Sequence, residues 1–126
     1  MLSTAACGSK ETKTVASEVA SEVASVAESA VAKSESDLKI GICIYKFDDN
    51  FMTLYREELK SYLMSEYGIP EANITIMDGK GDQAEQTNQI DNFITQGVDV
   101  MILNLVQASA TETIADKCNA AGIPAV

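Results

Sequence analysis

The segment LKIGICIYKFDDNF, residues 38–51, carries the main signals for the fold of this chain. Residues 40–45 form a nearly continuous apolar run, which is typical of a strand buried on both faces of a parallel sheet. The run stops at residues 46–50, four of which are polar, and a helical pattern follows at once. Open α/β sheets bind ligands at the carboxyl ends of their strands, beside the loops that lead into helices. The loop with Asp48 and Asp49 is therefore predicted to lie at a binding site.

Apolar runs and helical patterns alternate through the rest of the chain. The first strand is predicted at residues 38–45, two more at 73–77 and 98–106, and a fourth opens at 123–126. This alternation is typical of βαβ units and a parallel sheet. Right-handed crossovers then give the strand order 2-1-3-4 in a doubly wound sheet. The predicted fold class is α/β, an open parallel, Rossmann-like sheet with flanking helices, truncated at strand 4.

Three helices are predicted between these strands. Gly68 and Gly122 end the first and the third, because glycine readily adopts the left-handed conformation that terminates helices. The second covers residues 83–96, and Ser109 with Glu112 forms a capping-box pattern at the start of the third. The predicted inward faces are Met52, Tyr55, Leu59, Tyr62 and Leu63 in the first helix, Ile90, Phe93 and Ile94 in the second, and Ala110, Ile114, Cys118 and Ala121 in the third.

The composition of the 126-residue chain narrows the classes of function. The formal charge of −10 argues against a nucleic-acid partner, which would require clustered Lys and Arg. Histidine is absent, which removes the commonest general base and metal ligand and makes hydrolytic chemistry less expected. Three cysteines at unrelated spacings form no zinc pattern, and Cys43 and Cys118 are predicted to be small core residues. No apolar run approaches the roughly 18 residues that span a bilayer.

The first seven residues resemble the end of a lipoprotein signal peptide. Ala5 and Ala6 precede Cys7, as a signal peptidase requires, so Cys7 is predicted to carry a lipid anchor. Thr4 stands where a leucine is usual, and no basic and apolar regions precede it. Residues 1–7 are therefore interpreted as a truncated signal sequence. The alternative interpretation is an ordinary cysteine in a flexible segment.

Residues 8–37 are rich in Ser, Ala, Val and Glu and contain no aromatic residue. Val15, Val19 and Val23 are spaced by four and could align on a helix. Valine and serine are indifferent helix formers, however, and the apolar stripe is thin. The segment is therefore predicted to be a tether that holds a folded domain off a membrane. A coiled-coil arm is the alternative.

Several residues at the first strand end admit more than one role. Asp48 and Asp49 could cap the following helix, form an acidic Mg²⁺ pocket as in response-regulator receivers, or accept hydrogen bonds from sugar hydroxyls. A receiver would need a phospho-accepting Asp near the position of Asn104. Phe51 could be the first core residue of the helix, or a ring that packs on the apolar face of a pyranose. Tyr45, the last residue of the strand, could point either way.

The segment GICIYKFDDNFM, residues 41–52, resembles the opening of the glucose/galactose-binding proteins, members of the type I periplasmic sugar-binding family. The resemblance covers residues 38–126 and implies a partial N-terminal lobe of a sugar-binding domain. It places a sugar-contacting carboxylate at Asp49 and a stacking ring at Phe51. It also makes Tyr45 a hydrogen-bonding wall of the site. Asn104 fits either a second-tier polar contact or a loop brace. Further matches are Asp82-Gln83, Asn88-Gln89-Ile90-Asp91, Gly97-Val98, Asn104-Leu105-Val106 and Ile123-Pro124-Ala125-Val126.

The resemblance implies an extracytoplasmic solute-binding lipoprotein that captures a hexose, galactose or glucose, by closure of two lobes. The implied partners are the membrane subunits of an ABC importer and, in some bacteria, a chemoreceptor or sensor. No enzymatic activity and no cofactor are implied, and a calcium site of the kind some relatives carry would lie in the missing second lobe. One alternative is a binding protein for ribose or another small solute, because a fold does not fix its ligand. Another is a flavodoxin- or receiver-type signalling domain, although no Gly-rich phosphate loop follows the first strand.

Overall fold

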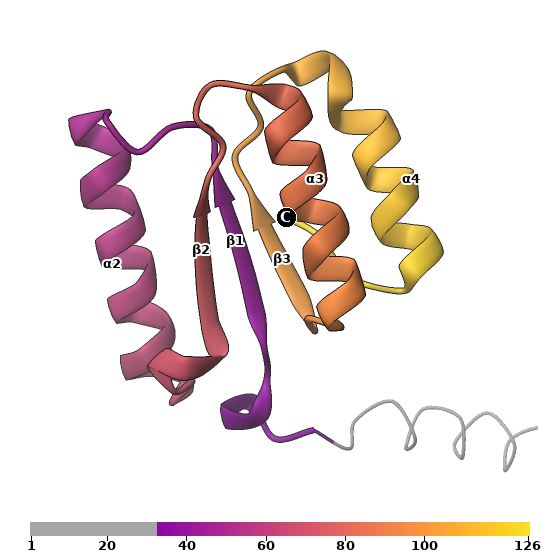
Figure 1. The fold of residues 1–126 in the computed structure, drawn as a ribbon. Coiled ribbons are helices and arrows are strands. Elements are labelled where there is room, and N and C mark those ends of the chain that lie inside the picture. The colour runs from indigo at the N-terminus through magenta and orange to yellow at the C-terminus, as the bar shows by residue number, and fades with distance from the viewer. Residues whose placement is uncertain (1–32) are drawn as a thin grey trace, which may run out of the picture. The chain divides into compact units, whose positions relative to one another are not determined.

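The computed structural model describes residues 33–126, which form an α/β domain with a parallel sheet (Figure 1). Within these residues the strands lie in the order β2-β1-β3, with Ile40 opposite both Ile74 and Val100. The elements are β1 (Ile40–Ile44), α2 (Asn50–Tyr67), β2 (Ile74–Asp78), α3 (Gln83–Gln96), β3 (Val100–Leu103) and α4 (Thr111–Ala121), with short 3-10 turns η1 (Glu35–Asp37), η2 (Glu71–Asn73) and η3 (Ala108–Ala110). The predicted fold class is confirmed. The predicted signal sequence, Cys7 and most of the tether lie outside the described residues.

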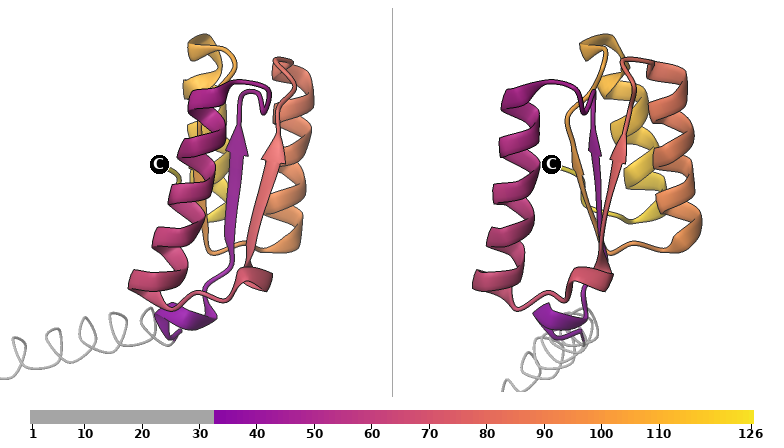
Figure 2. Two further views of the ribbon diagram at one scale, coloured as in Figure 1. Left: turned by 90° about the vertical axis from the view of Figure 1, so that its left-hand side faces the viewer. Right: turned by 60° about the vertical axis from the view of Figure 1, so that its left-hand side comes forward.

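The two faces of the sheet are covered by different helices: α2 on one face, α3 and α4 on the other (Figures 1 and 2). β1 is central and buried along its whole length. Ile42 and Ile44 pack in the cluster on the α2 side, with Leu63 of that helix. Cys43 packs in the opposite cluster, with Phe93 of α3. The apolar run that predicted a doubly buried strand is thus explained by its position.

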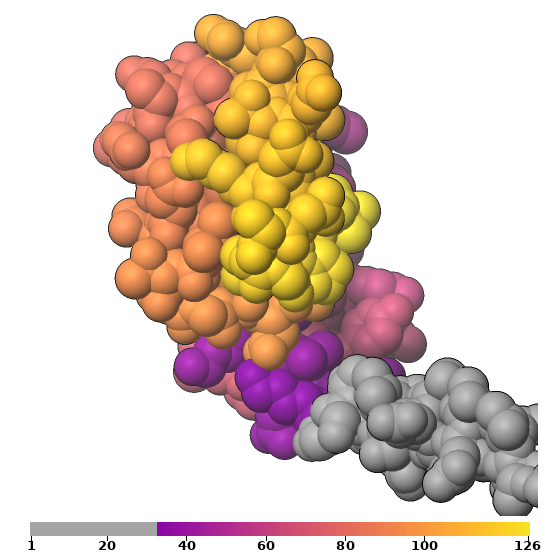
Figure 3. Space-filling model, turned by 90° about the vertical axis from the view of Figure 1, so that its right-hand side faces the viewer, coloured from indigo at the N-terminus to yellow at the C-terminus, as the bar shows by residue number. Residues whose placement is uncertain are grey.

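The helices α3 and α4 lie side by side over their face of the sheet (Figure 3). Lys117 of α4 reaches Asp91 of α3, with 2.7 Å between Nζ and Oδ1. Ile114 and Cys118 are buried beneath α4, as predicted. Within residues 33–126, none of the helices is both long and apolar enough to cross a membrane.

The last residues of the chain lie beside β3 at the position predicted for a fourth strand. Ala125 forms a parallel bridge with Met101. The amide of Val126 donates to the carbonyl oxygen of Met101 at 3.0 Å, and the amide of Leu103 donates to the carbonyl oxygen of Val126 at 2.8 Å. This pairing agrees with the predicted strand order 2-1-3-4.

Some predicted details of the helices and strands are wrong. Tyr55 and Tyr62 are 39% and 54% exposed, although both were placed on the inward face of α2. Residues three apart on a helix differ by about 60° in direction, so these tyrosines lie to one side of the line through Met52, Leu59 and Leu63. Phenol rings tolerate this position because their hydroxyls favour water.

The start and the end of α4 also differ from the prediction. Ser109 does not cap the helix, because residues 108–110 form the turn η3 and α4 begins at Thr111 without a side-chain cap. Ala121, predicted to face inward, is exposed in the last turn. Gly122 does end the helix, with φ 68°, and Gly68 ends α2 in the same way, with φ 64°. Glycine at these two positions avoids the steric cost that a side chain meets in the left-handed region.

The central strand approaches α3 so closely that Gly41 has no room for a side chain. A Cβ atom at Gly41 would lie 2.8 Å from Cγ of Phe93, whose ring is completely buried. Glycine in a strand often marks such a close approach. The pair therefore fixes the distance between β1 and α3.

We predict that Gly41→Ala lowers the free energy of unfolding by about 1–3 kcal/mol, because the added methyl group overpacks the core against Phe93. Chemical denaturation measures this change. A smaller side chain in the variant Phe93→Leu should relieve the overlap, so the double variant should be more stable than the sum of the two single changes predicts. Strict additivity of the two changes would contradict this account.

Candidate functional site

The candidate site is the rim where the strands end, formed by residues 45–51, 79–82 and 104–107 (Figure 1). Parallel strands place all their carboxyl ends at one edge of the sheet, so three loops that are distant in sequence meet there. The rim carries all four residues predicted to contact a ligand. These are Tyr45, Asp49, Phe51 and Asn104.

Asp49 occupies the N-cap of α2, one of the roles predicted for this pair of carboxylates. Its Oδ1 accepts hydrogen bonds from the amides of Phe51 at 2.8 Å and Met52 at 3.3 Å. Its Oδ2 accepts a hydrogen bond from the hydroxyl of Tyr45 at 2.6 Å. The Tyr45 hydroxyl, and then the two amides, lower the pKa of the Asp49 carboxyl below its usual value. The stabilisation from this ionised cap is therefore present above the usual carboxyl pKa and disappears as the pH falls through the lowered pKa.

Tyr45 links the first loop of the rim to the other two. Its amide donates to Oδ1 of Asn104 at 3.4 Å, and its carbonyl oxygen accepts from the amide of Gly81 at 2.8 Å. The hydrogen bond to Asp49 raises the pKa of the Tyr45 hydroxyl, which therefore stays protonated over the physiological range. Three of the four predicted site residues are thus connected through Tyr45.

Phe51 is the most exposed of the four predicted residues, with 67% of its surface accessible. The alternative that this ring is the first core residue of α2 is therefore wrong. Asp48 is also exposed, and its carboxylate pairs with Lys46 at 2.6 Å, not with the rim network. Within residues 33–126, no three His, Cys, Asp or Glu side chains gather closely enough to hold a metal ion. The first loop therefore presents the exposed aromatic ring of Phe51 two residues after the carboxylate of Asp49.

The glutamines of α3 that hold the third loop of the rim were not predicted from the sequence. Gln86 is completely buried; its Nε2 donates to the carbonyl oxygen of Asn104 at 2.8 Å and its Oε1 accepts from the amide of Val106 at 2.9 Å. Gln83 accepts from the amide of Gln107 at 2.8 Å. These bonds replace strand pairing after β3, which explains why that strand ends at residue 103 and not at 106. Gln86 lies on the same face of α3 as the buried ring of Phe93. That shared face was the sequence signal for a buried glutamine.

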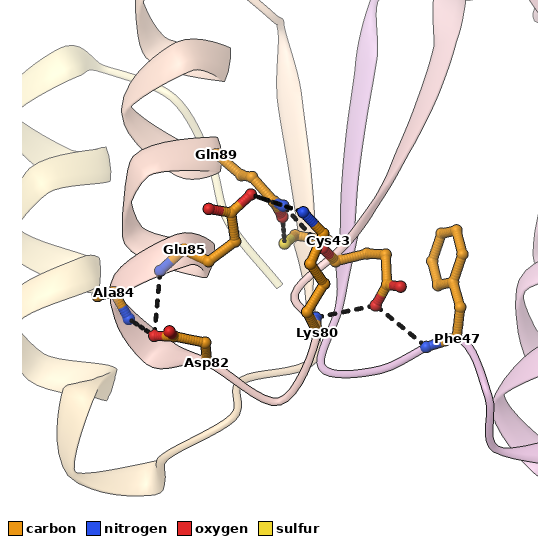
Figure 4. A network of polar contacts seen from close by, with 8 residues as sticks. Cys43, Phe47, Lys80, Asp82, Ala84, Glu85 and Gln89 are labelled. Atoms are coloured by element: carbon orange, nitrogen blue, oxygen red, sulfur yellow. Dashed lines mark hydrogen bonds and ion pairs between the residues drawn. The ribbon is translucent and has the colours of Figure 1, made fainter.

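A second buried glutamine joins the rim to the core (Figure 4). Nε2 of Gln89 donates to the carbonyl oxygen of Asp78 at 2.7 Å, and Sγ of Cys43 donates to Oε1 of Gln89 at 2.9 Å. Burial raises the pKa of the Cys43 thiol to about 11, so the thiol keeps the proton that it donates. Asp82 caps α3 as Asp49 caps α2, with Oδ1 accepting from the amides of Ala84 and Glu85. Side chains of the core and of α3 therefore hold the loops of the rim in place before any ligand is present.

Comparison with known proteins agrees with this fold. The profile of the family described as "Periplasmic binding protein domain" matches residues 40–126. The D-galactose/methyl-galactoside binding periplasmic protein MglB of Haemophilus influenzae is 37% identical over 98 residues, which are 78% of this chain and 29% of that protein. The ribose import binding protein RbsB of Bacillus subtilis is 27% identical over 93 residues, 74% of this chain and 29% of that protein.

Among solved structures, an ABC transporter solute binding protein from Bacillus halodurans with bound myo-inositol superposes with a TM-score of 0.61. It is 26% identical in sequence, and the alignment covers 75% of this chain and 31% of that one. This chain thus spans about 30% of the length of the relatives it matches. All three relatives are binding proteins by name. Because the family profile covers all of the sheet and its helices and the fold agrees, the chain belongs to the family of periplasmic binding protein domains.

Proposed function

We propose that this chain is one lobe of an extracytoplasmic sugar-binding protein that delivers a hexose, galactose or glucose, to an ABC importer. The observation that carries the proposal is an exposed aromatic ring, Phe51, two residues after the ionised carboxylate of Asp49. Sugars offer hydroxyl groups to carboxylates and apolar C–H faces to aromatic rings. The resemblance to a galactose-binding relative supports the choice of a hexose.

Asp49 retains capacity for a sugar hydroxyl despite its three internal hydrogen bonds. An ionised carboxylate offers about four acceptor positions. Two amides occupy Oδ1 and one hydroxyl occupies Oδ2, which leaves about one position on Oδ2. A hydrogen bond from a sugar hydroxyl to this oxygen is charge-assisted and therefore stronger than one to a neutral acceptor.

Tyr45 and Asn104, the other two residues proposed to contact the sugar, complete one wall of the site. Tyr45 is half-buried with its hydroxyl on Asp49, so a hydroxyl that binds this carboxylate lies within reach of the tyrosine oxygen. Asn104 uses its Oδ1 for the amide of Tyr45, whereas its Nδ2 has no hydrogen-bond partner among residues 33–126. We propose that this amide group donates to the ligand.

The second wall is proposed to come from a second lobe. The proposal rests on the share of the relatives that this chain spans, about 30%. Closure of the two lobes would then exclude water and strengthen the polar contacts. We propose no catalytic step and no cofactor for this lobe, and we place the calcium site of some relatives in the second lobe.

The amino-terminal segment is proposed to anchor the protein. Cys7 would carry the lipid at the extracytoplasmic face of the membrane, and residues 8–37 would form the tether. The described end of this segment contacts the domain, because Lys33 pairs with Asp99 at 2.7 Å. The same carboxylate accepts a hydrogen bond from the amide of Lys39 at 2.8 Å. Metabolic labelling with a fatty acid tests the anchor, since Cys7→Ser should abolish incorporation.

A ribose- or cyclitol-binding protein is the second candidate, because two of the relatives bind ribose and myo-inositol by name. Calorimetric titration of the intact protein with D-galactose, D-glucose, D-ribose and myo-inositol separates the candidates. Heat with a hexose supports the proposal. No heat with either hexose, but heat with ribose or myo-inositol, would replace it with the second candidate.

We predict that Asp49→Asn weakens hexose binding about tenfold, because a neutral acceptor replaces a charged one. Calorimetry on the intact protein measures the affinity. The unfolding temperature should change little, since asparagine caps helices about as well as aspartate. Asp82→Asn is the matched control for stability, because Asp82 caps α3 with the same two kinds of bond. Unchanged hexose affinity in Asp49→Asn would contradict the proposed ligand contact.

Phe51→Ala is expected to weaken hexose binding about tenfold, because the ring no longer packs on the sugar. Its exposure means that thermal stability should hardly change. Tyr62→Ala provides the control, since this ring is 54% exposed on the same helix but lies away from the rim. The stacking role fails if Phe51→Ala binds hexose as tightly as the parent protein.

A further inference from the structure

Phe47, in the first loop of the rim, is held by charged side chains of opposite sign from two other elements. Its amide donates to Oδ1 of Asp78, at the end of β2, at 3.1 Å. Its carbonyl oxygen accepts from Nη1 of Arg56, on α2, at 3.2 Å, and from the hydroxyl of Thr53 at 3.1 Å. The guanidinium carbon of Arg56 also lies 4.0 Å from the centre of the Phe47 ring.

Asp78 uses one oxygen atom to join two loops of the rim. The same Oδ1 accepts the amide of Lys80 at 2.9 Å, so it bridges residue 47 and residue 80 (Figure 4). Lys80 has φ 54°, an uncommon conformation for a residue with a side chain. Hydrogen bonds from amides to a carboxylate are roughly twice as strong as those between neutral groups. This single acceptor therefore holds both the first loop and an unfavourable turn in the second.

The guanidinium group of Arg56 lies against Phe47. Within residues 33–126 it forms no ion pair with a carboxylate. Its guanidinium instead stacks on the half-buried ring of Phe47 and donates to the carbonyl group of that residue. Planar guanidinium groups suit this combination of stacking and hydrogen bonding, which an ammonium group cannot reproduce.

We propose that Asp78 and Arg56 are positioning residues of the sugar site, which place Asp49 and Phe51 by clamping Phe47 from both sides. This inference rests on the proposed function for its effect on sugar binding. Asp49 follows Phe47 by two residues and must bring Oδ2 within 2.6 Å of the Tyr45 hydroxyl. A shift of Phe47 is transmitted directly to that contact. In metal sites, loss of such supporting contacts typically lowers affinity about 10- to 100-fold, and we expect a loss near the lower end here.

The test follows the Asp49–Tyr45 contact itself by NMR in the intact protein, with ¹³C labels on the Asp carboxyl and Tyr ring carbons. In Asp78→Ala, loss of a nearby negative charge alone would lower the pKa of Asp49. Loss of the hydrogen bond from Tyr45 would raise it toward the usual carboxyl value. We expect a rise. Asp78→Asn, which keeps an oxygen acceptor, should restore most of the parental titration.

Arg56→Gln gives an independent reading with the opposite charge change. Loss of a positive charge alone would raise the pKa of Tyr45, whereas loss of its hydrogen bond to Asp49 would lower it. We expect the pKa of Tyr45 to fall. Asp91→Ala, which removes the ion pair with Lys117, is the control and should leave both titrations unchanged. The two variants remove charges of opposite sign, and each is read through the pKa of a different residue. If Asp78→Ala fails to fold, the Arg56→Gln result therefore decides the test by itself.

Titration with D-galactose completes the experiment. Affinity should fall about tenfold in Asp78→Ala and Arg56→Gln and stay unchanged in Asp91→Ala. If the parent protein binds no sugar, the proposed function fails, and the NMR titrations alone decide the positioning role. A lower unfolding temperature with unchanged pKa values and unchanged galactose affinity would overturn the proposal, because Asp78 and Arg56 would then stabilise the fold without placing the site.

Discussion

Burial of β1 on both faces determines where the other elements of this domain lie. Ile42, Cys43 and Ile44 are inaccessible to water, so the strand can occupy only the centre of the sheet, between two parallel neighbours. Parallel pairing then directs the carboxyl ends of β1, β2 and β3 to one edge. Three loops with polar side chains meet there. The position of the rim is therefore a consequence of core packing and not of any loop by itself.

Asp49 combines a structural role, the N-cap of α2, with a proposed role in ligand binding. Its Oδ1 satisfies two amides at the start of α2, which no helical carbonyl group can reach. This bond fixes the direction of the carboxylate, and the Tyr45 hydroxyl fixes its second oxygen. A ligand would then meet a charged acceptor that needs little reorganisation. Preorganisation of this kind lowers the entropic cost of binding.

The sequence was sufficient for the fold and for the position of the rim, because both follow from local patterns. The apolar run of β1, the glycines after α2 and α4, and the carboxylate before α2 each predict a feature within a few residues of themselves. Gln86 and Gln89 were missed because glutamine is usually exposed, and their burial depends on backbone carbonyl and amide groups 11 to 20 residues away. The outward direction of Tyr62 and the missing cap at Ser109 likewise depend on how each helix is oriented and packed against the sheet.

The proposed sugar site requires that Asp49 and Phe51 together bind one face of a pyranose. A crystal structure of the intact protein grown with D-galactose would show whether they do. We expect the sugar ring to pack face to face on Phe51, with one hydroxyl within hydrogen-bonding distance of Oδ2 of Asp49. A sugar bound elsewhere, or a bound sugar that leaves the Phe51 ring in solvent, would rule out this role of the two residues.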